Sequence, residues 1–166
     1  MPDKVLVANR GEIAVRVLRT CRELGLKTVA VFSDADRGAP HVRYADEAFC
    51  VGPPPADQSY LRSDRILDVG QQSGARFVHP GYGFLAASAT FARECAESGL
   101  TFIGPRPATM EFLADRLAAR NLACQLGIPV AEVSEIGLDD SQLLAAADAI
   151  GYPVMLKPIA ADGAVG

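Results

Sequence analysis

Two patterns of hydrophobic positions alternate along the first hundred residues: short continuous apolar runs, and segments with an apolar residue every three or four positions. Lys4–Ala8 is a continuous apolar run of strand length, typical of a strand covered on both faces. Apolar residues then recur every three or four positions up to Leu24, which predicts a helix that Gly25 ends. The same alternation predicts further strands at 28–32, 48–51, 76–78 and 101–103, a helical turn at 41–45, and helices at 64–72 and 90–97.

Strands that alternate with helices through short connections predict an α/β fold with a parallel sheet of right-handed crossovers. In such a sheet the turns that leave the carboxyl ends of the strands lie on one edge. Ligands bind at that edge, where the strand order reverses. The turns expected there are Asn9–Glu12, Ser33–Arg37, Gly52–Pro55, His79–Phe84 and Gly104–Pro105.

After Pro105 the pattern changes to helices at 108–113, 115–126 and 141–150, the last one capped by Asp139-Asp140. Between and after them we expect a strand through Val133 and a final strand from Tyr152 to Leu156. Domain boundaries are predicted near 104–106 and 127–130. The sequence ends in a loop after a strand that has no partner, which is typical of a truncated domain.

Composition narrows the class of protein. The net charge of −4 comes from interspersed residues without a basic block, which argues against nucleic acid as a partner. No apolar run approaches the ~18 residues of a membrane span and no signal-peptide pattern is present, so we expect a cytoplasmic protein. The cysteines have no CxxC spacing and are expected to be reduced core residues; they are Cys21, Cys50, Cys95 and Cys124.

The segment His79-Pro80-Gly81-Tyr82-Gly83-Phe84 is the strongest candidate for a ligand-facing turn. Two glycines around an aromatic residue, opened by His-Pro, suit a rigid turn that brings backbone close to another group. His79 is more simply a structural hydrogen-bonding residue than a general base, because no nucleophile or carboxylate motif accompanies it. Tyr82 can contact a flat ligand or pack against the sheet edge, and both interpretations stay open.

Other candidate residues are less specific. The turn at Asn9 lacks the GxGxxG pattern, so a dinucleotide fingerprint is not supported. Glu12 can simply offset the helix dipole, or the turn can have a binding role, and both interpretations stay open. Lys157 follows an apolar run and precedes a loop with Gly163 and Gly166, where a lysine can reach phosphate oxygens or remain solvated. Arg19 and Glu23 form an i,i+4 pair that is either a solvated salt bridge or a subunit contact.

Several short stretches, in their order along the chain, go beyond a fold class. They are 7–14, 33–37, 41–42, 45–48, 52–53, 59–61, 79–85 and 102–105. With these stretches the sequence resembles the N-terminal domain of biotin carboxylase, as found in acetyl-, propionyl- and methylcrotonyl-CoA carboxylases and in pyruvate carboxylase. The resemblance is specific over residues 4–105 and looser beyond.

The resemblance implies an ATP-grasp ligase. In that family ATP and bicarbonate form carboxyphosphate, and the CO2 it releases carboxylates the ureido nitrogen of biotin on a carrier. It implies a Rossmann-like, parallel-sheet pre-ATP-grasp domain at 1–104, a helical connector at 105–130 and an incomplete ATP-grasp lid at 131–166. The implied cofactors are ATP, Mg2+ and biotin. The implied partners are a biotin carboxyl carrier protein or domain, a carboxyltransferase and a second copy of the chain, with a role in fatty acid metabolism.

Residue roles also follow from the resemblance. Lys157 stands where a lysine of the family contacts ATP phosphates, and Arg116, Gly163 and Gly166 belong to the same expected ATP site. The turn with His79, Gly81, Tyr82 and Gly83 faces the biotin and bicarbonate pocket. Arg19 and Glu23 lie on a helix near the dimer interface of bacterial members. No residue of this chain is assigned as catalytic or as a metal ligand, since the family's Mg2+ carboxylates lie beyond residue 166.

The sequence also departs from the family. Arg116 replaces a second nucleotide-contacting lysine, and its planar fork does not reproduce an ammonium. Ala86-Ala87-Ser88 replaces Ser-Glu-Asn, and 160–166 replaces a run of glycines with a segment that contains Asp162. Two hypotheses follow: the chain is the N-terminal part of a biotin carboxylase, inactive alone, or a degenerate non-catalytic homologue that acts as a binding or subunit-contact module.

Overall fold

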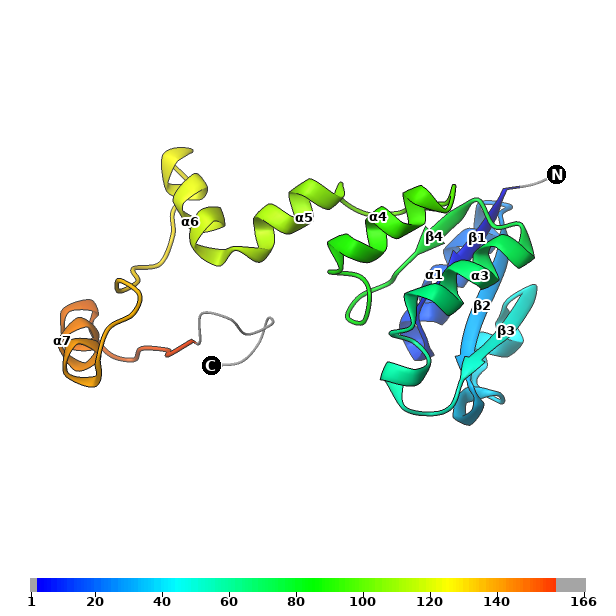
Figure 1. Ribbon diagram of the computed structural model, residues 1–166, viewed down its shortest axis with the longest axis horizontal. Helices are drawn as coiled ribbons and strands as arrows, with labels where there is room; N and C mark the ends of the chain where they lie inside the picture. The colour runs from blue at the N-terminus through cyan, green and yellow to red at the C-terminus, as the bar shows by residue number, and fades with distance from the viewer. Residues whose placement is uncertain (1–2, 158–166) are drawn as a thin grey trace. The chain divides into compact units, whose positions relative to one another are not determined.

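The computed structural model describes residues 3–157, and β1 (Lys4–Val7) is the middle strand of its sheet. The five-stranded sheet has the order β3-β2-β1-β4-β5, and every neighbouring pair is parallel. Strands β1 to β4 are labelled in Figure 1. Val5, Leu6 and Val7 are at most 1% exposed, as expected for a strand covered on both faces. The predicted α/β fold with a parallel sheet is therefore confirmed.

The helices and strands follow the predicted alternation through the fifth strand. Gly25 and Gly99, both with φ of +74°, follow two of the helices as their predicted stops. The bounds of the remaining elements are α1 Gly11–Glu23, β2 Lys27–Ser33, η1 Asp34–Asp36, α2 Pro40–Tyr44, β3 Glu47–Gly52, η2 Ala56–Gln58, α3 Ser63–Ser73, β4 Phe77–His79, α4 Ala89–Glu97, β5 Thr101–Phe102, α5 Pro107–Ala114, α6 Arg116–Gln125 and α7 Asp140–Ile150.

Helices cover both faces of the sheet, and β1 divides its side chains between them. Val5 and Val7 pack with the apolar stripe of α1. Leu6 belongs to the other core, together with Ile66 of α3 and Phe91 of α4. The sheet is therefore the middle of three layers, and the carboxyl ends of its strands point to one edge.

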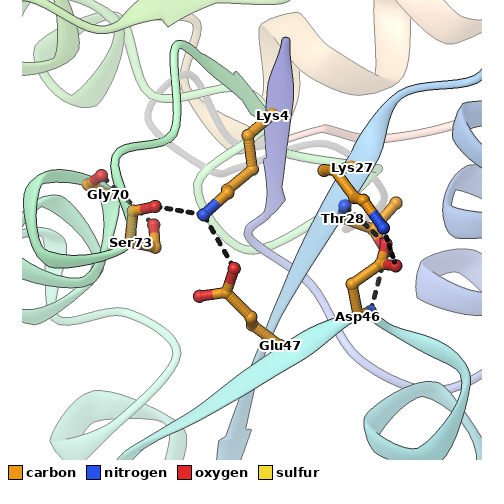
Figure 2. A network of polar contacts seen from close by, with 7 residues as sticks. All are labelled: Lys4, Lys27, Thr28, Asp46, Glu47, Gly70 and Ser73. Carbon is orange, nitrogen blue, oxygen red and sulfur yellow. Dashed lines mark hydrogen bonds and ion pairs between the residues drawn. The ribbon is translucent and has the colours of Figure 1, made fainter. Parts of the chain in front are cut away.

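A polar network joins the opposite, amino-terminal ends of β1, β2 and β3 (Figure 2). Asp46 accepts hydrogen bonds from the backbone N–H (2.9 Å) and the hydroxyl (2.7 Å) of Thr28 and pairs with Lys27 at 3.1 Å. These hydrogen bonds, first of all that from the Thr28 hydroxyl, lower the pKa of Asp46 to about 2. Lys4 pairs with Glu47 at 2.7 Å and donates to the carbonyl of Ser73. The network ties the starts of these strands together.

Contacts divide the chain into two units, residues 1–116 and 117–166, which are described separately. In the second unit, α7 begins with a capping box in which Asp139 accepts from the N–H of Gln142 and the Gln142 side chain accepts from the N–H of Asp139. The two strands predicted there are wrong. No strand forms through Val133 or over Tyr152–Leu156, and within residues 117–157 no other strand offers either segment a partner.

The cysteine prediction is only half right. Cys21 and Cys95 are buried core residues, whereas Cys50 and Cys124 are exposed. Cys124 lies on α6, and no residue of that helix is buried, so its apolar stripe does not form a core among the described residues. In residues 3–157 no helix has the length and apolar character needed to cross a membrane.

Candidate functional site

The strand order reverses between β1 and β4, and the turns that follow these two strands meet there. The side-chain amide of Asn9, after β1, donates to the carbonyl oxygens of Pro80 and Tyr82, after β4, at 2.7 Å each. Its oxygen accepts from the N–H of Arg10 at 2.8 Å. Asn9 is only 2% exposed, so these bonds form away from bulk water. The expected proximity of the Asn9 and Tyr82 turns at one sheet edge is confirmed.

Gly81 is required at this junction for two independent reasons. Its φ is +68°, and a Cβ on it would lie 2.7 Å from Nδ2 of Asn9. Gly83 also has a positive φ, +63°, but a Cβ there would meet no neighbouring atom. The first glycine therefore permits the close approach of the two turns, whereas the second only permits the backbone conformation.

His79, the last residue of β4, stabilises the turn. Its Nδ1 accepts a hydrogen bond of 3.0 Å from the N–H of Gly81. Burial lowers the pKa of His79, so the ring is neutral near pH 7 and can act as this acceptor. This geometry agrees with a structural role for His79.

Tyr82 points its hydroxyl to Glu12 in the first turn of α1, and its side chain is 60% exposed. The hydrogen bond to Glu12 raises the pKa of Tyr82, and the same bond lowers the pKa of Glu12. The phenol is therefore a donor and the carboxylate an acceptor near neutral pH. Tyr82 does not pack into the sheet edge; its exposed ring is accessible to a flat ligand.

A second polar cluster lies at the same edge of the sheet. No functional role was predicted for its residues from the sequence. Asp36 accepts a two-point contact from Arg10 at 2.6 and 2.7 Å and a hydrogen bond of 2.6 Å from the hydroxyl of Tyr60. The hydrogen bonds from Arg10, above all, lower the pKa of Asp36. The stretches 33–37 and 59–61 contributed to the resemblance, but nothing in their local pattern indicates that they meet.

Arg19 and Glu23 are exposed on α1, and no ion pair joins them in the described part of the chain. The interpretation as an intrahelical salt bridge is therefore not supported. Arg19 contributes instead to a shallow hollow of about 440 Å³ beside the start of α1. Its lining residues are Gly11, Glu12, Val15, Arg16, Arg19 and Pro40.

The predicted ATP-contacting residues fall in different parts of the chain. Arg116 is the first residue of α6, and Lys157 is an exposed residue outside any helix or strand. Gly163 and Gly166 lie outside the described residues. In residues 3–157 no three His, Cys, Asp or Glu side chains are grouped so that they could hold a metal ion. The ATP-contacting roles remain predictions.

Comparison with known proteins gives two family matches. Residues 1–110 match the family described as biotin carboxylase, N-terminal domain. Residues 115–166 match the ATP binding domain of the carbamoyl-phosphate synthase L chain. The two matches meet close to the division between the two units.

Similar proteins are longer than this chain. A biotin carboxylase of Halalkalibacterium halodurans is 49% identical over all of this chain, which spans 37% of that protein. The mitochondrial methylcrotonoyl-CoA carboxylase subunit alpha of Oryza sativa is 52% identical over 99% of the chain, which spans 22% of it.

A solved structure agrees with these matches. The biotin carboxylase domain dimer of Hydrogenobacter thermophilus 2-oxoglutarate carboxylase, in complex with MgADP, ADP and bicarbonate, has a TM-score of 0.86. It is 46% identical, over 98% of this chain and 36% of its own. The meeting of the Asn9 and Tyr82 turns, the parallel sheet and the match over residues 1–110 lead to one assignment: this chain belongs to the biotin carboxylase family and contains the N-terminal domain of that family.

Proposed function

We propose that this chain supplies the pre-ATP-grasp part of a biotin carboxylase and forms one side of the biotin and bicarbonate pocket. The observation that carries the proposal is the amide of Asn9, which holds the Gly81–Phe84 turn against the end of β1. That contact places an exposed Tyr82 at the switch point of the sheet, where ligands of parallel sheets bind.

The groups on this turn suit a planar, uncharged ligand edge such as a ureido ring. Tyr82 offers an exposed aromatic face and a protonated hydroxyl. The neutral ring of His79 accepts from the N–H of Gly81, which supports the conformation of the turn. In the proposed reaction, ATP transfers its γ-phosphoryl group to bicarbonate, which gives ADP and carboxyphosphate, and carboxyphosphate breaks down to phosphate and CO2. The ureido nitrogen of biotin then gives its proton to that phosphate and attacks the CO2, which gives N-carboxybiotin. This chain's part is to orient biotin.

The ATP side of the proposal rests on residues 115–166, which comprise the second unit and the two residues before it. Residues 115–166 match an ATP-binding domain, and the relative from Hydrogenobacter thermophilus is described with MgADP. We assign Lys157, Arg116, Gly163 and Gly166 to phosphate contacts, with Mg2+ held by residues that this chain does not supply. The division into 1–104, 105–130 and 131–166 is part of the same proposal.

The remaining parts of the proposal concern partners and location. Arg19 and Glu23 would lie at a homodimer interface, since both are exposed on α1. A biotin carboxyl carrier and a carboxyltransferase would complete the reaction, in a cytoplasmic protein of fatty acid metabolism. Fractionation of cells that express the tagged full-length protein tests the location.

A degenerate, non-catalytic homologue is the second candidate. Arg116 and the segment 160–166 favour it, because Asp162 adds a negative charge where the family has glycine beside phosphate. This alternative predicts that the first unit folds and contacts a subunit while nucleotide chemistry fails.

Chimeras with the biotin carboxylase of Halalkalibacterium halodurans separate the two candidates. In one, residues 1–110 of this chain replace the aligned residues of that enzyme; in the other, residues 1–166 do. We expect the first chimera to keep biotin-dependent ADP formation within about tenfold of the enzyme, a barrier change of about 1.4 kcal/mol. A folded but inactive first chimera would refute the proposed function.

The second chimera tests the altered loop. If it is inactive while the first is active, restoring Asp162→Gly and Arg116→Lys should recover activity, which would assign the defect to the ATP side. The 166-residue chain by itself is expected to release no phosphate from ATP with bicarbonate and free biotin. Biotin-dependent phosphate release by the chain alone would contradict that expectation.

A further inference from the structure

Tyr60 lies where the loops that follow three different strands meet. Its hydroxyl accepts from the N–H of Ser33 at the end of β2 (2.9 Å) and donates to Asp36 (2.6 Å). The guanidinium of Arg10, after β1, lies 5.6 Å from the ring centroid. The ring also stacks on Phe84, after β4, with centroids 5.5 Å apart and 25° between the planes. Tyr60 is only 2% exposed, so these contacts are buried packing contacts and not chance contacts at the surface.

Phe84 needs such support because its backbone is strained. Its φ is +37°, and among residues 3–157 no other non-glycine residue has a positive φ. A conformation of this kind persists only where the surrounding contacts enforce it. The ring of Phe84 is 37% exposed, and its stacking partner is the buried ring of Tyr60.

The turn is therefore held at both of its ends by side chains from other strand ends. Asn9 bonds the carbonyls of Pro80 and Tyr82, which fixes the first half. Tyr60 supplies the ring that stacks on Phe84, while next to it Leu85 packs in the core and the N–H of Ala86 donates to the carbonyl of Gly83 at 2.8 Å. Relaxation of Phe84 toward a negative φ would rotate the peptide next to Gly83 and with it the backbone that carries Tyr82.

We propose that Tyr60 is a positioning residue that sets the shape of the Gly81–Phe84 turn through its stack on Phe84. The effect on substrate rests on the proposed function of that turn. If the turn orients biotin, Tyr60 sets the affinity for the biotin ring without touching it. The Tyr60 hydroxyl bonds Asp36 of the Arg10–Asp36 pair, whereas the stack on Phe84 is made by the ring alone.

The first test uses the 15N-labelled 166-residue chain and the amide resonances of Gly81, Gly83 and Phe84. Tyr60→Leu and Phe84→Leu both remove the stack, and we expect these resonances to broaden or double. Tyr60→Phe keeps the ring and should retain single resonances. Tyr44→Leu is the matched control, because Tyr44 is a half-buried tyrosine of the same unit that contacts Arg22 and not the turn.

Unchanged turn resonances in folded Phe84→Leu would overturn the proposal, even if Tyr60→Leu fails to fold.

The second test uses the chimera with residues 1–110. There Phe84→Leu and Tyr60→Leu should raise the KM for biotin about fivefold or more while the KM for ATP stays within about twofold. Tyr60→Phe should rescue the KM for biotin, and Tyr44→Leu should change neither constant.

Equal changes in both KM values, or none, would also overturn the proposal, because a purely structural residue does not discriminate between the two substrates. An inactive unsubstituted chimera would instead refute the proposed function. In that case the amide measurements on the chain alone still decide whether Tyr60 positions the turn.

Discussion

At the scale of single residues, the contact between the turns that follow β1 and β4 depends on a side-chain amide, whose nitrogen carries two hydrogen-bond donors. The amide of Asn9 bonds two carbonyl oxygens that are two residues apart, and its own oxygen receives the next backbone N–H. Aspartate has the same shape but offers only acceptors, and serine offers a single donor. Asparagine therefore fits this position for a chemical reason that hydrophobic patterning cannot reveal.

Asn9→Asp should destabilise the first unit strongly. The variant turns two donors into a carboxylate that faces two carbonyl oxygens in a buried place, which costs on the order of 3 kcal/mol in the free energy of unfolding. Urea denaturation at pH 7 measures the loss. Asn121→Asp, an exposed position of the second unit, should change stability little. Equal losses in the two variants would contradict the bridging role of Asn9.

Gly81→Ala tests the close approach of the two turns. Gly74 has nearly the same φ, +67°, but a Cβ there meets no atom within 4 Å, so Gly74→Ala is the matched control. The control should lose about 1 kcal/mol from its left-handed backbone, and Gly81→Ala should lose about 2–3 kcal/mol, because Asn9 must also move. Thermal unfolding of both variants gives the difference; no difference would show that the junction tolerates a Cβ.

The sequence predicted the turn with Tyr82 but not the cluster that supports it. Two glycines around an aromatic residue are a local signal, and local signals can be read from a single chain. Asp36 is the last residue of η1 and Tyr60 lies 24 positions later, in the turn after η2, so no period relates them. Their contact depends on the order of the strands in the sheet, which the hydrophobic pattern alone does not determine.

At the scale of elements, the predictions succeed where an element carries its own boundary signals. Ser88 accepts from the N–H of Phe91 at 3.1 Å, and α4 begins at Ala89, one residue before the predicted start. The strand predicted over Tyr152–Leu156 failed because a strand is stable only with a partner, and an apolar run contains no information about whether one exists. Within the described residues Tyr152, Met155 and Leu156 are at least 65% exposed instead.

The pairing of β2 with β3 should weaken at acid pH through Asp46. Its pKa is lowered to about 2, so its contribution is present above pH ~4, the unfolded value, and is lost as the pH falls toward 2. The carboxylate is 30% exposed, so solvent screening limits this contribution to about 1–2 kcal/mol. Urea denaturation between pH 2 and pH 6 measures it for the original chain and for Asp46→Asn.

The variant Asp46→Asn should be less stable at pH 6 and should show a flatter pH dependence below pH 4. Asp68→Asn, at an exposed position of α3, is the control and should keep the original profile. An unchanged profile in Asp46→Asn would show that other carboxyl groups cause the acid sensitivity.

At the scale of the whole molecule, the first unit separates two tasks along its strands. The amino ends carry the Lys4–Glu47 and Lys27–Asp46 pairs, which tie neighbouring strands together (Figure 2). The carboxyl ends carry the turns with Asn9, Phe84 and Tyr60, which contain the strained and exposed groups. A parallel sheet permits this division because all its strands point the same way, so the turns that leave the carboxyl ends lie on one edge and the amino ends on the other.

Hydrogen exchange of the complete chain should differ between its two units. The amides of β1 should exchange slowest, because they lie in the middle of a five-stranded ladder and their side chains are buried. The amides of Tyr152–Leu156 belong to no ladder and should exchange at least about a hundredfold faster than those of β1. Comparable protection of both segments in the monomer would mean that the second unit acquires a strand partner, and would restore the prediction that the structure overturns.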